Sequence, residues 1–249
     1  MSLLQTHLLQ TRGLSRHFGG VQAVREVDFE LPAGEIRAVI GPNGAGKTTL
    51  VSMISGRIRP SAGRIRFKGA DITGLRNWQR ARRGIVYTFQ ITSVFQNLSC
   101  HDNVALALQR KRMTGLSGRV HLDADALRGE AEMALDRVGL AARLDERAAN
   151  LPYGHQRLLE LAMGLALAPE LLIMDEPTQG LSESEILAFC DLIRRIARET
   201  TVLLIEHNMA VVMALAGRIT VMNEGAILAE GTPAEIAANI DVQHAYLGT

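Results

Sequence analysis

The chain has 249 residues, and its 27 lysine and arginine residues against 26 aspartate and glutamate residues give a formal net charge of +1. This length suits one large α/β domain or one domain with an inserted subdomain, and the balanced charge argues against the strongly basic surface of nucleic-acid-binding proteins. No apolar run is long enough to span a bilayer, and residues 1–10 lack the pattern of a signal peptide, so we expect a cytoplasmic protein. Cys100 and Cys190 lie far apart in the sequence, which favours buried thiols over a disulfide or a metal site.

The first part of the chain predicts an antiparallel β layer. Residues 8–12 and 23–31 have strand-like composition on either side of a turn at 17–20. A third short strand, at residues 64–67, lies between two turns that contain glycine. The turns would return this strand to the same layer.

One glycine-rich stretch, residues 41–49, lies between an apolar run at 36–40 and a helical pattern at 50–54. Its glycines let successive backbone N–H groups curl around phosphate oxygens, and the helix N-terminus adds the positive end of its dipole. Lys47 is placed to reach the β- and γ-phosphates, and the Thr48 hydroxyl is placed to bind the magnesium ion that bridges them. The stretch therefore predicts a nucleoside triphosphate site, in which Thr49 is expected to pack.

The middle of the chain changes to helical spacing. Apolar residues recur at this spacing from residue 103 to 140 among charged residues, which predicts a helical insert with a solvated face. A further amphipathic helix is expected at 156–167, and the tail predicts alternating helices and strands. Ser182 and Glu185 form a capping-box pattern that predicts a helix start.

Polar residues follow three apolar runs that predict buried parallel strands, at the positions Gln90, Asp175 with Glu176, and His207. Because the carboxyl ends of parallel strands face the ligand crevice, we expect these side chains beside the glycine loop. An aspartate there fits a magnesium partner held through water, and the adjacent glutamate can polarise the attacking water as general base. His207 would hold the γ-phosphate or orient that water. Taken singly, Gln90 also suits a turn and His207 a buried, hydrogen-bonded histidine.

With these motifs in this order, the chain resembles the ATP-binding-cassette (ABC) ATPases over essentially its whole length. The corresponding motifs are Walker A at 41–48, the Q-loop residue Gln90, Walker B at 171–175 with the catalytic Glu176, the D-loop near 180–182 and the switch histidine His207. The resemblance implies an α/β fold with a P-loop NTPase core around a parallel sheet, an N-terminal antiparallel β layer and an inserted helical subdomain. It also implies a single ABC ATPase domain over residues 1–249. The nucleotide-binding core and β layer would take up about 1–90 and 160–249, and the helical signature subdomain about 91–159.

The resemblance further implies the residues of the site, with ATP and Mg²⁺ as cofactors. The catalytic residues would be Glu176, His207 and Gln90, and the metal ligands would be Thr48, Gln90 and Asp175. The nucleotide would be bound by Phe18, stacked on adenine, and by Gly41, Asn43, Gly44, Ala45, Gly46, Lys47, Thr48, Thr49, Tyr153 and Gly154.

The signature segment of this family corresponds to residues 151–156, Leu-Pro-Tyr-Gly-His-Gln, where the family has Leu-Ser-Gly-Gly-Gln. Tyr153 also occurs in the ATPases of branched-chain amino acid importers, a subgroup that the chain resembles at several other short stretches. Pro152 replaces a serine or alanine and removes both a hydroxyl and an N–H. Proline is comfortable at a helix start, but we expect a weaker γ-phosphate contact across a dimer.

These features predict the ATP-binding and ATP-hydrolysing subunit of an ABC importer for branched-chain or related amino acids. Importers of urea, amides or aromatic acids would carry the same motifs, and a non-transport cassette, such as an iron–sulfur assembly component, is an alternative. The implied partners are a second ATPase subunit, identical or paralogous, transmembrane permease subunits and, indirectly, a substrate-binding protein, with no nucleic acid. Such a subunit would be cytoplasmic and peripheral on the inner face of the cell membrane.

An apolar cluster follows Gln90, at Ile91, Val94, Phe95 and Leu98. Its spacing predicts either a short helix packed on the helical insert or an exposed patch. In the resembling family this region receives a cytoplasmic helix of the permease. The second interpretation therefore makes Val94 and Phe95 partly exposed anchors for that helix.

Overall fold

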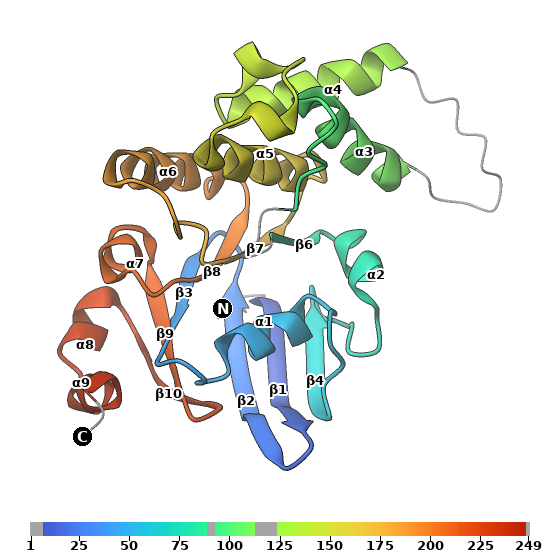
Figure 1. The fold of residues 1–249 in the computed structure, drawn as a ribbon. Coiled ribbons are helices and arrows are strands. Elements are labelled where there is room, and N and C mark those ends of the chain that lie inside the picture. The colour runs from blue at the N-terminus through green and yellow to red at the C-terminus, as the bar shows by residue number, and fades with distance from the viewer. Residues whose placement is uncertain (1–6, 89–92, 113–123, 248–249) are drawn as a thin grey trace, which may run out of the picture.

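A computed structural model of the chain describes residues 7–88, 93–112 and 124–247 (Figure 1). Two sheets and a group of helices make up this part of the chain. The predicted fold class is confirmed, with a parallel core sheet, an antiparallel β layer near the N-terminus and a helical insert. Gln90 and Ile91 lie outside the described residues.

The larger sheet positions the glycine loop. Its strands run in the order β10-β9-β3-β8-β7-β6, and all neighbouring pairs are parallel except β10 with β9. The strands are β3 (Ile36–Ile40), β6 (Ile85–Thr88), β7 (Leu171–Asp175), β8 (Thr201–Ile205), β9 (Arg218–Asn223) and β10 (Ala226–Gly231). Strand β3, which leads into the glycine loop, lies between β9 and β8, and β7 is the next strand beyond β8. The carboxyl ends of β7 and β8 therefore meet the loop at one edge of the sheet.

The smaller sheet is antiparallel and has the order β2-β1-β4-β5. Its strands are β1 (His7–Phe18), β2 (Val21–Pro32), β4 (Ala62–Phe67) and β5 (Ala70–Asp71). The first two strands are longer than the sequence predicted, because they continue up to the tight turn that joins Phe18 to Val21.

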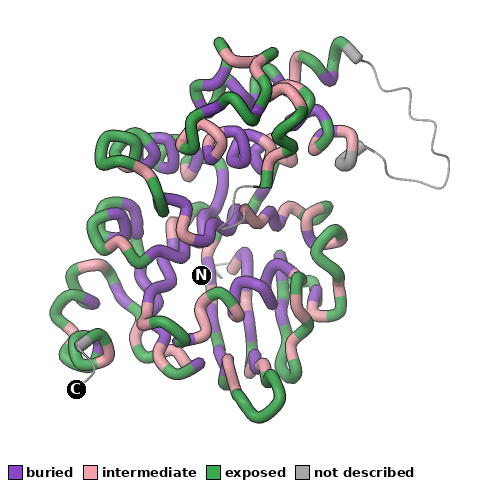
Figure 2. The backbone as a smooth tube through the Cα atoms, in the orientation of Figure 1, coloured by how far each residue is buried: buried purple, intermediate pink, exposed green. Residues whose placement is uncertain are grey.

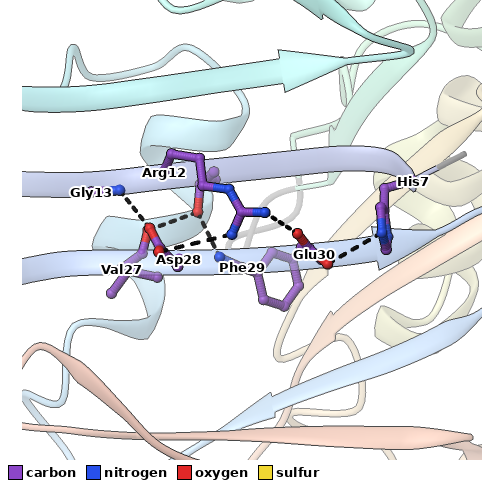
Figure 3. Close-up of polar contacts among 8 residues, drawn as sticks. His7, Arg12, Gly13, Val27, Asp28, Phe29 and Glu30 are labelled. Carbon is purple, nitrogen blue, oxygen red and sulfur yellow. Dashed lines mark hydrogen bonds and ion pairs between the residues drawn. The ribbon is translucent and has the colours of Figure 1, made fainter.

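Polar contacts between β1 and β2 bridge the stretch where the register of this pair shifts (Figure 3). The buried Thr11 hydroxyl donates to the carbonyl oxygen of Val27 at 2.9 Å and accepts from the N–H of Phe29 at 3.0 Å. On the same pair of strands, Arg12 forms ion pairs with Glu30 and Asp28. These contacts hold the irregular stretch in the ladder, as expected at a β-bulge.

Alternate residues of β7 show how the larger sheet is covered on both faces. Leu171 and Ile173 pack in a core shared with the helix after the glycine loop and the β layer, whereas Leu172 and Met174 pack with helices on the other face. Successive side chains of a strand point to opposite faces. Every residue of β7 and β8 is buried, as expected for strands covered on both sides, and Figure 2 shows the sheet as the buried centre of the molecule.

The helices are α1 (Lys47–Ile54), α2 (Asn77–Ala81), α3 (Cys100–Arg112), α4 (Ala124–Arg137), α5 (Tyr153–Ala166), α6 (Glu183–Ile196), α7 (Met209–Leu215), α8 (Pro233–Ala237) and α9 (Ile240–Leu247). Helix α1 lies on the face of the sheet that carries the β layer, and α5, α6 and α7 lie on the opposite face. Helices α3 and α4 pack on α5 and project from the core (Figure 1). Among the described residues, no helix is both long and apolar enough to cross a bilayer.

Several local predictions are confirmed, and others are corrected. Ser182 caps α6 through its hydroxyl, in a capping box with Glu185. The helix predicted at 156–167 begins earlier, at Tyr153, and α2 was not predicted. Residues 93–98 contain no helix, so the interpretation of this stretch as a short helix is wrong for the residues described.

Buried Arg80 of α2 fixes the end of α1. Its guanidinium donates to the carbonyl oxygens of Met53 at 2.6 Å, Ile54 at 2.8 Å, Leu75 at 3.1 Å and Thr73 at 2.9 Å. The last carbonyls of a helix lack partners within the helix, and a cation there also complements the helix dipole. Burial lowers the pKa of Arg80 to about 10. The helix that starts at the glycine loop is therefore anchored at its far end.

Candidate active site

The glycine loop runs from Gly41 at the end of β3 to Gly46 at the start of α1. Two of its glycines are required by close backbone approaches. A Cβ atom on Gly41 would lie 2.1 Å from the carbonyl oxygen of Met222, and one on Gly46 would lie 2.4 Å from that of Ala23. Gly46 has a φ of 98° and no side chain caps α1, so the first N–H groups of the helix face the loop. This arrangement is suited to an anion.

Lys47 places its ammonium group over the same loop. Its Nζ donates to the carbonyl oxygens of Gly41 at 2.8 Å and Pro42 at 3.0 Å. Partial burial lowers the pKa of Lys47, while the nearby carboxylates of Glu176 and Asp175 oppose that shift. The ammonium group therefore lies between the glycine loop and the acidic end of β7, where a phosphate held by the loop would meet it.

Asp175, the last residue of β7, is buried and held by a residue of the neighbouring strand. The Tyr87 hydroxyl on β6 donates to Oδ2 of Asp175 at 2.8 Å, and the Arg57 guanidinium lies 4.9 Å from the centre of the Tyr87 ring. Burial raises the pKa of Asp175, and the Tyr87 hydrogen bond and the charges of Arg57 and Lys47 act against it. Burial and the adjacent carboxylate also raise the pKa of Tyr87, so it stays a donor.

Oxygen donors near the loop fit a magnesium ion. Thr48 is exposed on α1, and its hydroxyl has no hydrogen bond to another described residue. The described residues contain no cluster of three or more histidine, cysteine or acidic side chains that could hold a metal by themselves. Mg²⁺ is usually bound by one or two protein oxygens together with substrate phosphates, so Thr48 and Asp175 match its needs.

Glu176 and His207 lie together at the ends of neighbouring strands. Oε1 of Glu176 is 3.7 Å from Nδ1 of His207, which follows β8. Glu176 has a φ of 49°, a conformation that is uncommon for residues other than glycine, and its N–H donates to the carbonyl oxygen of Ile205 at 2.9 Å. Backbone strain of this kind often occurs at functional sites. The predicted general base and the predicted switch histidine are thus brought together.

The signature segment lies at the start of α5, on the other face of the sheet from α1. Pro152 is the N-cap residue, and it provides no side-chain cap. The Tyr153 ring packs against Gly180, where an added Cβ would lie 3.0 Å from the ring, and Gly154 abuts the Glu185 carboxylate, 2.3 Å from an added Cβ. The segment is therefore in contact with the loop after β7 in its own chain.

Phe18, the predicted adenine platform, is 46% exposed at the end of β1. The Arg16 guanidinium lies 4.5 Å from the centre of its ring, which is a cation–π contact. An exposed ring with a cation against it remains available for stacking. Asn43 and Gly44 are also exposed, in the glycine loop.

Two residues of this site, Tyr87 and Arg57, were not predicted from the sequence. Tyr87 lies near the carboxyl end of a predicted parallel strand, and this position was the available signal. The structure places Lys47, Asp175, Glu176 and His207 at one edge of the sheet, as predicted, and leaves Tyr153 and Gly154 on the opposite face from α1. Gln90, the remaining predicted catalytic and metal-binding residue, lies outside the described residues.

The fold and the glycine loop define a P-loop nucleotide-binding protein. Asp175, Glu176 and His207 lie beside the loop at the carboxyl ends of β7 and β8. Residues 24–179 match the family model described as ABC transporter. The chain is 41% identical over 250 residues to the high-affinity branched-chain amino acid transport ATP-binding protein LivG of Salmonella typhimurium, with 97% of this chain and 98% of that protein covered. It is 38% identical to BraF of Pseudomonas aeruginosa, a protein of the same description, with the same coverage.

Solved structures agree with this assignment. The ADP conformation of MJ1267, an ATP-binding cassette of an ABC transporter, superposes with a TM-score of 0.84 at 25% identity, covering 98% of this chain and 99% of that one. The chain belongs to the ABC transporter ATPases, a family whose cassettes bind and hydrolyse ATP, dimerise and act with membrane permease subunits.

Proposed function

We propose that this chain energises an ABC importer for branched-chain or closely related amino acids, as one ATPase domain with a helical signature subdomain at about residues 91–159. The observation that carries the proposal is the meeting of the glycine loop, Asp175, Glu176 and His207 at one sheet edge. The similarity to LivG and BraF along almost the whole chain supports the substrate class.

ATP would be held by its phosphates first. The N–H groups of Gly41 to Thr48 would surround the β- and γ-phosphates, with Lys47 moving from the loop carbonyls to the phosphate oxygens. Phe18 would stack on adenine. A bound magnesium ion would neutralise charge on the phosphates, with Thr48 as a direct ligand and Asp175 acting through water.

Hydrolysis would then depend on residues at the strand ends. Glu176 would accept a proton from the water that attacks the γ-phosphate, and His207 would hold that phosphate or orient the water. Tyr87 would keep the Asp175 carboxylate in place through its hydrogen bond. We also propose Gln90 as a γ-phosphate sensor, on the strength of its position in the sequence alone.

A second ATPase subunit would complete each site. The glycine loop covers one side of the nucleotide, whereas Tyr153 and Gly154 lie at the start of a helix on the opposite face of the sheet. A two-fold pairing would bring the Tyr153 and Gly154 of one subunit against the nucleotide of the other and would form two sites at once. ATPase activity per chain should therefore rise with protein concentration. A rate strictly proportional to protein at low micromolar concentration would contradict the shared site.

The transport role is tested by the proteins that co-purify with the chain and by the stimulation of its ATPase activity by substrate. Affinity purification of the full chain from membranes should recover permease subunits, which would hold the chain at the cytoplasmic face. The ATPase activity of this complex in proteoliposomes should rise with a binding protein loaded with leucine, isoleucine or valine, and less with urea or benzoate. Recovery with soluble partners only would favour a non-transport cassette.

A further inference from the structure

A buried carboxylate that the proposed mechanism does not use joins the two loops that carry the reacting side chains. Glu206 follows β8, directly before His207, and is 1% exposed. Among the described residues it has no ion pair with a lysine, arginine or histidine side chain. A buried carboxylate is costly unless hydrogen bonds replace its hydration.

Four donors from two loops supply those hydrogen bonds. Oε1 of Glu206 accepts from the N–H of Thr178 at 3.1 Å and from the Thr178 hydroxyl. Oε2 accepts from the N–H of His207 at 3.0 Å and from that of Asn208 at 3.1 Å. One oxygen therefore holds the loop after Walker B, and the other holds the loop that contains the histidine.

The first of these loops needs such support. Glu176 has a left-handed φ of 49°, and strained backbone persists only where its surroundings over-determine it. The Glu176 N–H is bound to the carbonyl oxygen of Ile205, and Thr178, two residues later, is bound to Glu206. Ile205 at the end of β8 and Glu206 directly after it thus fix the two ends of the short turn that presents Glu176.

We propose that Glu206 is a positioning residue for ATP hydrolysis, which sets Glu176 and His207 relative to each other by binding both loops. The inference rests on the proposed function, because Glu206 would act through Glu176, the proposed general base. It assigns Glu206 no contact with nucleotide, so ATP affinity should depend little on it. Turnover should depend on it strongly, because small misplacements of reacting groups are expensive in rate.

Glu206→Gln tests this with little change in shape. The amide keeps one acceptor and turns an NH₂ group toward one of the two loops, where it faces the N–H of Thr178 or the N–H groups of His207 and Asn208, none of which can accept from it. In the purified full chain we expect kcat for ATP to fall by about 10- to 100-fold, the order expected for displacement of reacting groups by up to about 1 Å. The dissociation constant for ATP, measured by fluorescence with a labelled analogue, should stay close to that of the parent. Glu199→Gln, at an exposed glutamate paired with Arg137, is the matched control and should change neither value.

A double mutant separates positioning from general destabilisation. If Glu206 acts by setting Glu176 against His207, adding Glu206→Gln to Glu176→Gln should lower the residual turnover by much less than the fall of about 10- to 100-fold expected in the parent background. Thr178→Val, which removes only the hydroxyl donor, should cause a smaller fall in kcat and provides the test if Glu206→Gln does not fold.

Three outcomes would overturn the proposal. The first is a parent-like kcat in Glu206→Gln or, where that variant does not fold, in Thr178→Val. The second is a loss of ATP binding that parallels the loss of turnover. The third is a fall in turnover in the double mutant, relative to Glu176→Gln, as large as the fall that Glu206→Gln causes in the parent. Failure of the proposed function is seen separately, since Glu176→Gln would then hydrolyse ATP normally.

Discussion

Oε1 of Glu176 lies 3.7 Å from Nδ1 of His207, although the two residues follow different strands. This separation is too long for a direct hydrogen bond, so the two side chains lie next to each other without one. The His207 side chain is mostly exposed, which leaves it accessible to a phosphate held by the glycine loop.

Glu176→Gln should keep ATP binding and nearly abolish turnover. The amide preserves the shape of the side chain but cannot accept the proton, and loss of a general base typically costs about 100- to 10,000-fold. Steady-state ATPase rates and ATP binding of the purified variant check the prediction. Lys47→Ala is the contrasting variant and should lose ATP affinity, because it removes the cation over the loop. Turnover within a few-fold of the parent in Glu176→Gln would assign the base to another residue.

Arg80→Met should destabilise the fold. Several buried carbonyl groups, at the end of α1 and in the segment before α2, would lose their donor. Each buried group left unsatisfied costs about 1–3 kcal/mol, so we expect a loss of about 2–4 kcal/mol in the free energy of unfolding, allowing for partial rearrangement. Denaturant unfolding followed by circular dichroism measures it. Arg83→Met, at an exposed arginine next to the same helix, should change the free energy by less than about 0.5 kcal/mol.

The features predicted from sequence are those that depend on neighbouring residues in the chain. The glycine loop, the Ser182 cap and the acidic end of β7 each follow from a short pattern, and the apolar runs of β7 and β8 show their burial on both faces. Asp175 and His207 lie at one edge of the sheet because β7 and β8 are parallel neighbours, and the carboxyl ends of parallel strands lie at the same edge.

The features that were missed depend on pairs of residues far apart in the sequence. Tyr87 bonds Asp175 only because β6 lies beside β7, and Arg80 reaches the carbonyls of α1 only because α2 packs at that end. Glu206 is a charged residue after an apolar strand, which on sequence alone suits a solvated loop. Its burial became visible only with the packing of the loop after β7 against the loop after β8.

Pro152→Ser should be tolerated, with ATPase activity at or above that of the parent. Pro152 is exposed and occupies the N-cap of α5, where a serine hydroxyl would cap the helix and stabilise it by about 0.5–2 kcal/mol. The change also restores a hydroxyl and an N–H beside Tyr153. Pro152→Ala restores the N–H without the hydroxyl and so separates the two effects. A loss of activity with retained folding would show that the rigidity of proline is needed in this segment.

The loop after the undescribed residues 89–92 presents Phe95 to solvent, with its side chain 56% exposed. Buried Asn103 holds the main chain of this residue, accepting from its N–H at 2.7 Å and donating to its carbonyl oxygen at 3.1 Å. Val94, the second predicted anchor, is partly buried and packs against the helical core. These backbone contacts therefore do not depend on the Phe95 ring.

Phe95→Ala should leave the isolated chain folded, with near-normal basal ATPase activity, and should weaken its association with permease subunits. More than half of the surface of Phe95 is exposed, whereas truncation of an apolar anchor in an interface typically costs about 2 kcal/mol or more. Thermal unfolding, basal ATPase rates and co-purification from membranes measure the three quantities, and substrate-stimulated turnover should fall with association. Met133→Ala, at a side chain of α4 that is 62% exposed, is the control for an apolar surface residue of the same helical region. A Phe95→Ala variant that unfolds, or one that assembles and transports like the parent, would return Phe95 to a structural role.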